Sequence, residues 1–599
     1  MRPPFRPLAR FGLLTGAAAG AVEVALRASP RQGLGAAEVA TWLGASIGLG
    51  TAFGLALAVA AWIVGRRSYG LVVAGILGLH AAVNYRFEWV LNEFVRDPRV
   101  WGGIGASLLL SLLVGLGSDR WLRRVLGASG GPLRPLLRGA VLAGVGLAFL
   151  RANGPAGHVG PRPSVLVISL DTARFDRLSP YGHAIDTPIL ERLAREGVVF
   201  DQAIAAAPIT EPSHLSLFTG RPPLATGVVS NGTNLGDRPE LLWRALQAEG
   251  FLTAGFVAGF PLHGKYGWGQ GMNVYDDDFG GLAGLQMLGL VKAFNQVALK
   301  EHALRERPAA RVLARAVPWI EAHRDTQFFA FVHLYDAHGP YDQPTNAALG
   351  PAPTDGPALA LPPYWPAPDR RITSPDWLAR AYDNELVAVD AAVGQLLAAL
   401  GPRLDETIVM VTADHGESLT EHDYLFDHGD NLYDPSLRVP WIVRFPPTAT
   451  AGVRVPCQVG GVDLTPTVLD LVGLVDNVPR EGVSRVSELR GGPCRELPVY
   501  ASTVAGRLVA DPPTDHALRG QGRKLILHQG GATGAGGAEL YDLVADPGES
   551  VNLAPNEVSD AMSALLEARV AGATVTSPEL DTETAAMLKA LGYTDGSTE

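Results

Sequence analysis

The stretch PSVLVISLDT, residues 163–172, sets the expected fold of this chain. Val165 to Leu170 form a short, nearly continuous apolar run, which is typical of a buried strand in a parallel sheet, and Asp171 follows at its carboxyl end. The stretch TIVMVTADHGE, residues 407–417, repeats the arrangement, with Ile408 to Val411 as the strand. Together they predict an open α/β sheet, in which ligands bind outside the carboxyl ends of the strands.

Asp171, Asp414 and His415 lie just past these two strand ends and are candidate metal ligands. Either Asp alone is more simply interpreted as a helix N-cap, a common position for Asp after a strand. The pair with an adjoining His favours a metal site at the sheet edge. Mixed oxygen and imidazole ligands favour zinc or manganese, with calcium and magnesium as alternatives.

A turn with a hydroxyl side chain lies between the two stretches, in APITEPSHLSLFTGRPP, residues 207–223. Thr210 precedes Pro212, and the apolar residues that follow predict a turn leading into a buried helix. A threonine at a helix start is often only an N-cap. It becomes a nucleophile when a metal or a base activates it, so a catalytic role for Thr210 depends on the metal site.

Two loops with histidines follow. FFAFVHLYDAHGPY, residues 328–341, predicts a strand from Phe328 to Leu334 and then a loop with His338. LFDHGDNLYDPSLRVPWIV, residues 425–443, places His428 in a loop before another apolar strand. A single loop histidine is usually only a polar residue on the protein surface, but both of these lie near strand ends. We therefore expect them at the same sheet edge as the aspartates.

The residues before about 150 carry the hydrophobic excess of the chain, which is 47% hydrophobic overall. Apolar segments at roughly 11–26, 40–64, 69–85, 102–118 and 135–150 predict a transmembrane region, residues 1–151, of about five helices. Arginines are richest before the first segment, after the second and after the fourth, which predicts a cytoplasmic amino terminus. With five spans, the later residues are extracytoplasmic; an even number would reverse this.

The expected location is therefore the inner (cytoplasmic) membrane, with a multi-pass topology and the lipid bilayer as a partner. Residues 152–163 are rich in Gly and Pro and predict a linker. The net charge of −11 and the lack of a basic stripe argue against a nucleic-acid partner. Cys457 and Cys494 lack zinc-ribbon spacing. A disulfide between them is permitted outside the cytoplasm, and two separate buried thiols are the equal alternative.

Further motifs follow one another in order between residues 163 and 555: SLDTARFDRLSPYG, TEPSHLSLFTGR, HLYDAHGPY, VTADHGE, LYDPSLRVPWIV and AELYDLVADPGESVNLA. With these motifs the chain resembles the sulfatase family of the alkaline phosphatase superfamily. The resemblance implies an α/β alkaline-phosphatase-like catalytic core at 164–490, with a central mixed sheet flanked by helices. It also implies a C-terminal subdomain and tail at 491–599, with a small antiparallel sheet around 496–545.

The resemblance also suggests the metal site and the nucleophile. Asp171, Asp414 and His415 match the family's metal ligands, and Thr210 occupies the nucleophile's position, where its hydroxyl would be a further ligand. Typical sulfatases read Cys-x-Pro-Ser-Arg here, and the Cys (or a Ser) is oxidised to formylglycine. This chain reads TEPSH, and threonine cannot become formylglycine. In this respect it is similar to the threonine-nucleophile phosphoethanolamine transferases and lipoteichoic acid synthases.

The remaining candidates are implied to face the substrate. His338 and His428 match residues that contact the ester's oxyanion or leaving group, so they are predicted to be catalytic. His214, at the Arg position of the motif, and Lys265, in HGKYGWG, are predicted substrate contacts. Thr172 stands where the family usually carries a second Asp.

Three functions are compatible with these residues. The first is metal-dependent hydrolysis or transfer of a phosphate ester or diester of an envelope lipid or glycan, through Thr210. The second is sulfate ester hydrolysis without formylglycine. The third is a non-catalytic envelope protein, which we consider weaker because each expected position holds a chemically competent residue.

Overall fold

The computed structural model describes residues 162–278, 307–341, 344–362, 365, 369–504, 514–528, 537–554 and 560–571. The five predicted membrane spans lie outside these residues. The chain divides into two compact units, and the fold described below belongs to the unit made of Gly157–Asp277 and Arg305–Glu599. Among the described helices, only the continuous segment Pro375–Glu406 has the length and apolar composition of a membrane span. More than half of its apolar window is buried inside the domain, as in a core helix.

The described strands between residues 164 and 460 form one eight-stranded mixed sheet in the order β4-β3-β5-β1-β6-β7-β2-β8. β7 runs antiparallel to both of its neighbours, β6 and β2, and the other pairs are parallel. The strands are β1 Ser164–Leu170, β2 Val198–Ile204, β3 Leu252–Phe256, β4 Val274–Asp276, β5 Phe328–Leu334, β6 Thr407–Thr412, β7 Arg438–Arg444 and β8 Val453–Gly460. The predicted central mixed sheet is confirmed, and the three apolar runs quoted above are β1, β5 and β6.

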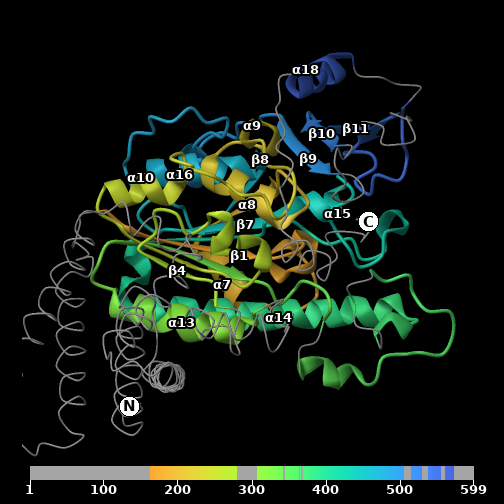
Figure 1. Ribbon diagram of the computed structural model, residues 1–599, viewed down its shortest axis with the longest axis horizontal. Coiled ribbons are helices and arrows are strands. Elements are labelled where there is room, and N and C mark those ends of the chain that lie inside the picture. Colours follow the sequence, from red (N-terminus) through yellow and green to blue (C-terminus); the bar gives the residue numbers. More distant parts are fainter. Residues whose placement is uncertain are drawn as a thin grey trace, which may run out of the picture. The chain divides into compact units, whose positions relative to one another are not determined.

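Helices cover both faces of this sheet (Figure 1). One layer holds α7 Pro188–Glu196, α13 Ala309–Ala322 and α14 Pro375–Leu400, and the other holds α8 Thr210–Thr219, α10 Leu242–Ala248 and α16 Leu464–Leu471. Shorter helices are α9 Pro223–Thr226, α15 Asp434–Leu437 and α17 Val486–Leu489. Every residue of β1, β5 and β6 is buried, which explains why these strands show no apolar-polar alternation.

The C-terminal part forms a separate four-stranded antiparallel sheet in the order β12-β11-β10-β9. Its strands are β9 Val499–Val504, β10 Thr514–Gly520, β11 Arg523–His528 and β12 Gly537–Asp542, and α18 Asp560–Ala571 packs on it. Leu518, Leu525 and Leu540 of the sheet share an apolar cluster with Leu566 of α18. The predicted small antiparallel sheet is therefore confirmed, while the boundary at 490/491 stays a prediction.

A disulfide joins Cys457 of β8 to Cys494, which lies shortly before β9. It links the last strand of the large sheet to the segment that enters the small one. Of the two alternatives left open by the sequence, the structure has the disulfide.

Candidate functional site

The site lies at the carboxyl ends of β1, β5 and β6, which are neighbours in the sheet. Asp171 follows β1, and its backbone N–H donates to the carbonyl of Leu334 at the end of β5, 2.8 Å away. Asp414 and His415 follow β6. The structure brings Asp171, Asp414 and His415 together, completely buried, with one potential ligand atom from each within 4.8 Å of the others.

Several buried polar atoms in this cluster lack a hydrogen-bond partner. They are Asp171 Oδ1, Asp414 Oδ2, His415 Nε2 and Thr210 Oγ1. Buried polar atoms are ordinarily paired, so four unpaired ones in one place need an explanation. His415 Nδ1 lies 2.9 Å from the carbonyl of Gly416 and donates to it, which leaves a lone pair on Nε2. This is the tautomer that a metal-binding imidazole requires, so the residues fit a divalent metal ion.

The charges point to the same conclusion. Burial raises the pKa of Asp171 to about 7, although the nearby His428 and His214 oppose this. The Thr210 side chain opposes it as well, because it lies close enough to Asp171 to interact, without a hydrogen bond of normal geometry. Burial and the charge of Asp171 raise the pKa of Asp414 well above its usual value. Two buried carboxylates side by side repel each other, and a bound divalent cation would stabilise both in their charged form.

A second group within ligand distance consists of His214, His333 and Asp414. The N–H of Ala258 donates to His333 Nδ1 over 3.4 Å, so the proton of this neutral ring lies on Nε2, which donates to Asp171 Oδ2 over 3.0 Å. His333 thus orients Asp171 and leaves its Oδ1 toward the metal site. This matches the outer-shell hydrogen bonds that support metal-ligating carboxylates.

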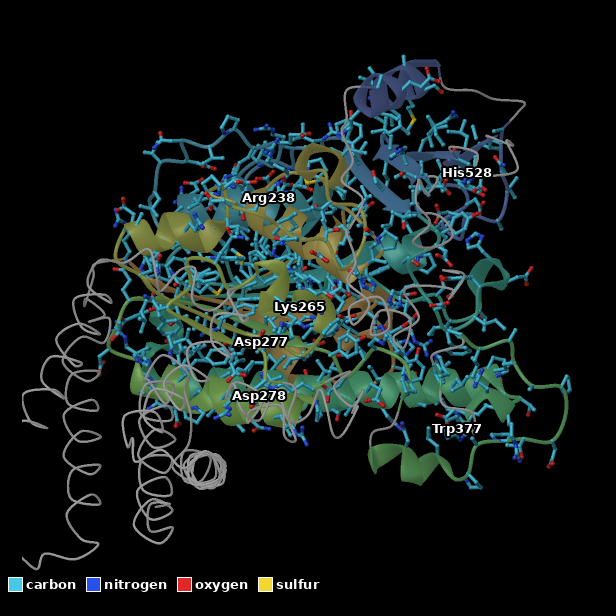
Figure 2. All side chains as sticks on the ribbon, in the orientation of Figure 1. Arg238, Lys265, Asp277, Asp278, Trp377 and His528 are labelled. Atoms are coloured by element: carbon cyan, nitrogen blue, oxygen red, sulfur yellow. A yellow bond between two sulfur atoms is a disulfide. The ribbon has the colours of Figure 1, made fainter. Side chains whose placement is uncertain are left out.

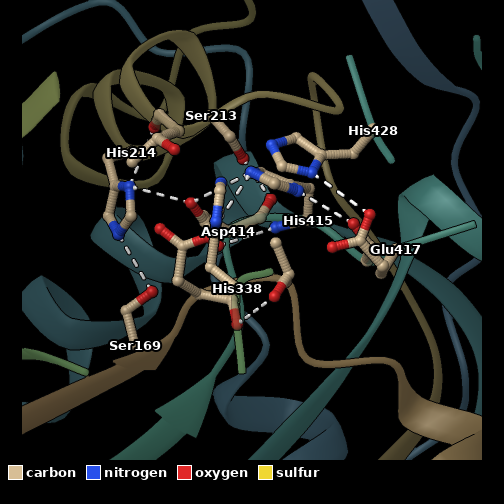
Figure 3. A network of polar contacts seen from close by, with 12 residues as sticks. Ser169, Ser213, His214, His338, Asp414, His415, Glu417 and His428 are labelled. Carbon is tan, nitrogen blue, oxygen red and sulfur yellow. Dashed lines mark hydrogen bonds and ion pairs between the residues drawn. The ribbon is translucent and has the colours of Figure 1, made fainter. Parts of the chain in front are cut away.

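His214 is held in a comparable way beside Asp414, on the left in Figure 3. Its Nδ1 donates to the carbonyl of Thr210 over 2.8 Å, and its Nε2 accepts from the hydroxyl of Ser169 over 2.9 Å. Both ring nitrogens are therefore engaged, and the side chain is completely buried. This geometry favours a supporting role rather than the predicted substrate contact.

His333 was not singled out from the sequence. A signal was present, because it is the only ionisable residue in the otherwise apolar β5. It also pairs in register with Ser169, a polar residue of β1. Two polar residues facing each other across buried parallel strands indicate a shared hydrogen-bond network near the strand ends.

Thr210 is the first residue of α8, which is buried along its whole length. The first turn of the helix is clamped on two sides. The hydroxyl of Ser213 donates to the carbonyl of Asp414, and the Glu211 carboxylate accepts from the N–H groups of Gly232 and Thr233. Thr210 is thus held at the N-terminus of a ten-residue helix, where the helix dipole favours negative charge.

His338 and His428 face each other next to His415 (Figure 3). Their ring centres are 4.8 Å apart, and those of His415 and His428 are 4.5 Å apart. His338 Nδ1 donates to the carbonyl of Gly339 over 2.7 Å, and burial lowers the pKa of this ring well below its usual value. His338 is therefore neutral, with its proton on Nδ1.

His428 is in the opposite electrostatic state because of Glu417, a residue not singled out from the sequence. Burial lowers the pKa of His428, but the Glu417 carboxylate, with Asp427 and Asp171, outweighs burial and raises it to about 9. Glu417 Oε1 lies 3.3 Å from His428 Nδ1, and Glu417 is completely buried. The site thus contains one neutral and one protonated histidine side by side.

Thr172 and Lys265 are the remaining positions of interest. Thr172 has a backbone φ of 54°, which is uncommon for a β-branched residue, and its hydroxyl donates to the Asp171 carbonyl over 2.8 Å. It offers no carboxylate to the site. Lys265 lies on a 3-10 turn, Gly264–Tyr266, with its ammonium group 4.5 Å from the ring centre of Phe260 (Figure 2). Its contact with a substrate stays a prediction.

Comparisons with known proteins identify the family to which the chain belongs and proteins with a similar fold. The family model described as "Sulfatase" matches residues 163–474, more than half of the chain. Arylsulfatase K of Gallus gallus is 28% identical over 494 residues, which cover 71% of this chain and 84% of that protein. A solved structure in complex with its substrate D-glucosamine-2-N,6-O-disulfate has a TM-score of 0.54 at 20% identity and covers 68% of this chain and 97% of that one. The phosphonate monoester hydrolase of Agrobacterium radiobacter has a TM-score of 0.52 at 21% identity, covering 72% and 96%. At these identities, the structural likeness shows the fold.

Proposed function

The chain belongs to the sulfatase family, and from this premise we propose that it hydrolyses sulfate esters through Thr210 in a metal-dependent reaction. One observation carries the proposal. The unpaired, buried Thr210 Oγ1 is joined by the unpaired Asp171 Oδ1, Asp414 Oδ2 and His415 Nε2. A nucleophile and a set of metal ligands are thus left without internal partners at the sheet edge where ligands bind in α/β folds.

Asp171, Asp414, His415 and Thr210 would hold the ion, with zinc or manganese favoured by the mixed ligands. A bound divalent ion supplies Lewis-acid chemistry, which makes the threonine hydroxyl more acidic and offsets charge on the ester's oxygens.

The chain's own residues account for the proton transfers. Thr210 Oγ attacks the ester sulfur, and its proton passes to the neutral His338 at Nε2. The sulfur–oxygen bond to the alcohol breaks as protonated His428 gives a proton to the departing oxygen. Glu417 holds His428 in the orientation for this transfer. Water then attacks the sulfur of the sulfated threonine and gives a proton to neutral His428, while the departing Thr210 oxygen takes back the proton held on His338. This releases hydrogen sulfate and restores the Thr210 hydroxyl, neutral His338 and protonated His428.

A second candidate is hydrolysis or transfer of a phosphate ester or diester by the same residues. Thr210 favours it, because a threonine side chain cannot form the aldehyde hydrate that sulfatases normally use. The product of attack would be phosphothreonine, and water or an acceptor alcohol would then take the phosphoryl group.

Our proposal for the location is a multi-pass protein of the inner membrane with its catalytic domain outside the cytoplasm. The predicted spans before residue 150 support this, and so does the disulfide between Cys457 and Cys494, since disulfides persist in oxidising compartments. The substrate would then be an ester on an envelope lipid or glycan.

The test uses the full-length chain in detergent with zinc or manganese. 4-Nitrophenyl sulfate and bis(4-nitrophenyl) phosphate are offered in parallel, and intact mass is recorded during turnover. Turnover of the sulfate ester, lost in Thr210→Ala, is expected. Turnover of the phosphodiester alone, with a phosphoryl adduct on Thr210, would favour the second candidate. Activity that survives Thr210→Ala would exclude both mechanisms.

A further inference from the structure

The segment that follows His428, residues 429–434, is held by the C-terminal antiparallel sheet. Each of the four strands sends one side chain to it. Thr503 of β9 donates to the Gly429 carbonyl, Arg519 of β10 lies 3.1 Å from Asp434 Oδ2, Lys524 of β11 donates to the Leu432 carbonyl over 3.1 Å, and Glu539 of β12 accepts from the Tyr433 hydroxyl over 2.9 Å. A separate sheet thus contacts this short segment at four points.

Lys524 is the centre of this contact. Its side chain is completely buried, and its Nζ lies 2.6 Å from both Asp434 Oδ1 and Glu549 Oε1. Glu549 also accepts from the backbone N–H of Asp434 over 2.6 Å. Because unpairing a buried charge is costly, the segment cannot leave the sheet without a large loss of stability. The segment is therefore firmly attached to an element outside the large sheet.

His428 directly precedes this segment, and its backbone N–H donates to Asp427 Oδ1 over 2.9 Å. The hydroxyl of Tyr424 donates to the His428 carbonyl over 3.0 Å, and Glu417 holds the ring. These contacts all come from residues 417–428, so the position of the ring next to His338 and His415 also depends on where the following residues are held.

We infer that the C-terminal sheet positions His428 for the reaction, with Tyr433 and Thr503 as positioning residues. The inference rests on the proposed function for what His428 does in the reaction. The placement of the segment itself can be measured without any turnover.

The chain offers a matched pair of variants for the test. Tyr433 and Tyr541 both donate to the same oxygen, Glu539 Oε2, over 2.9 and 2.8 Å. Tyr433 lies on the segment, whereas Tyr541 lies on β12 itself. Both variants remove a hydroxyl from the same acceptor, but only Tyr433→Phe removes a bond between the segment and the sheet. In Tyr541→Phe the Tyr433 hydroxyl loses a neighbouring hydroxyl and keeps its own bond to Glu539.

The kinetic measurement compares two esters on full-length protein with zinc. Phenyl sulfate needs a proton on its departing oxygen more than 4-nitrophenyl sulfate does, so it reports on His428. For Tyr433→Phe we expect kcat for phenyl sulfate to fall about tenfold, a smaller loss for the nitrophenyl ester, and an unchanged KM. Tyr541→Phe should leave all of these values unchanged.

A second pair checks the result at another strand. Thr503→Val removes the hydroxyl that donates to Gly429 and keeps the side-chain shape, whereas Thr503→Ser keeps the donor. We expect the Val variant to behave as Tyr433→Phe and the Ser variant as the wild type. Equal behaviour of Val and Ser would argue against positioning through this bond.

Amide hydrogen exchange of residues 426–434, read by mass spectrometry, tests the placement independently of activity. Exchange should be faster in Tyr433→Phe and Thr503→Val but not in Tyr541→Phe. Unchanged exchange in all variants, or an equal loss of kcat in both tyrosine variants, would overturn the inference. If the wild type turns over neither ester, the proposed function fails, and the exchange experiment alone then decides whether the sheet holds the segment.

Discussion

Two buried polar regions of the domain differ in whether their polar groups have partners within the protein. At the edge of the large sheet, Asp171 and Thr210 each keep a buried oxygen without a hydrogen-bond partner. Where the C-terminal sheet meets residues 429–434, the buried cation Lys524 lies between two carboxylates at 2.6 Å, and Arg519 approaches one of them. The first region is incomplete by itself, and the second balances its own charges.

This difference distinguishes two functions of buried polar residues, binding a ligand and holding a segment in place. A site that must accept a ligand cannot satisfy its groups internally, so it costs stability until the ligand binds. A site that must hold a segment in place gains from ion pairing between its buried charges, because any opening leaves a charge without its counterion. Removing a group should therefore affect activity in the first region and stability in the second.

The largest expected effect on activity is that of Thr210→Ala. Loss of the nucleophile should lower kcat/KM by about a thousandfold or more, whereas the free energy of unfolding should stay nearly unchanged. The reason is that the lost hydroxyl has no partner to leave behind. Ester turnover and denaturant unfolding, recorded on the same preparation, measure both quantities. If Thr210→Ala lowered the unfolding free energy as much as Lys524→Met is expected to, the proposed difference between the two regions would be wrong.

Lys524→Met should give the opposite result in the other region. It leaves Asp434 and Glu549 as two buried carboxylates without their shared cation, which costs about 3–5 kcal/mol of unfolding free energy. Urea unfolding measures the loss. Adding Glu549→Gln to this variant should recover part of it, since one of the unbalanced charges is then removed.

Removal of the metal should lower the thermal stability of the protein. An ion present at about a hundred times its dissociation constant stabilises by about 2.7 kcal/mol, and chelation removes this amount. Asp414→Asn should abolish the difference between metal-loaded and chelated protein, because it removes a ligand and one of two adjacent carboxylates. Scanning calorimetry with and without chelator gives the comparison. A shift that persists in Asp414→Asn would place the ion elsewhere.

The smallest effect concerns His528 on the C-terminal sheet (Figure 2). Hydrogen bonds to Asp515 and Glu539 raise its pKa from 6.5 to about 10, so its contribution to stability is complete below pH 6.5 and is lost as the pH rises through 10. Burial raises the pKa of Glu539, but hydrogen bonds from His528 and two tyrosines outweigh it and bring it from 4.5 to about 2. The Glu539 contribution is therefore present above pH 4.5 and is lost as the pH falls through 2.

His528→Ala should consequently destabilise most between pH 4.5 and 6.5, by less than about 1 kcal/mol, because the side chain is partly exposed to solvent. The difference from the wild type should shrink toward pH 10. Unfolding free energies measured across this range provide the check, and a difference that grows toward alkaline pH would contradict the assigned pKa direction.

Much of the fold could be predicted where a short stretch carries its own signal. β1, β5 and β6 are continuous apolar runs because they are buried on both faces. Such burial can be predicted from consecutive residues of the sequence. The strand-end rule then placed Asp171, Asp414 and His415 at one edge, where the structure has them together. The small C-terminal sheet followed from the family resemblance rather than from any pattern in its own strands.

The supporting residues could not be found in the same way. Glu417 looks ordinary in the sequence, and His333 stands out only as the one ionisable residue of β5. The importance of both comes from the partners that folding brings to them, His428 and Asp171. Which histidine is protonated is likewise a matter of neighbours. His338 and His428 are both buried loop histidines, and only the one beside Glu417 has a raised pKa.

The sequence by itself thus determined the buried strands β1, β5 and β6 and the strand ends that bring Asp171, Asp414 and His415 together. The family resemblance added the mixed sheet and the prediction that Thr210 is the nucleophile. Only the tertiary structure decided that Cys457 and Cys494 are bonded and that the His415 proton lies on Nδ1. It also decided that Lys524 donates to the carbonyl of Leu432, 92 residues earlier in the chain. The physical reason is the range of the interactions. A buried strand requires apolar residues at consecutive positions, so it can be recognised in the sequence. The hydrogen bonds and ion pairs of a site join residues that become neighbours only after folding.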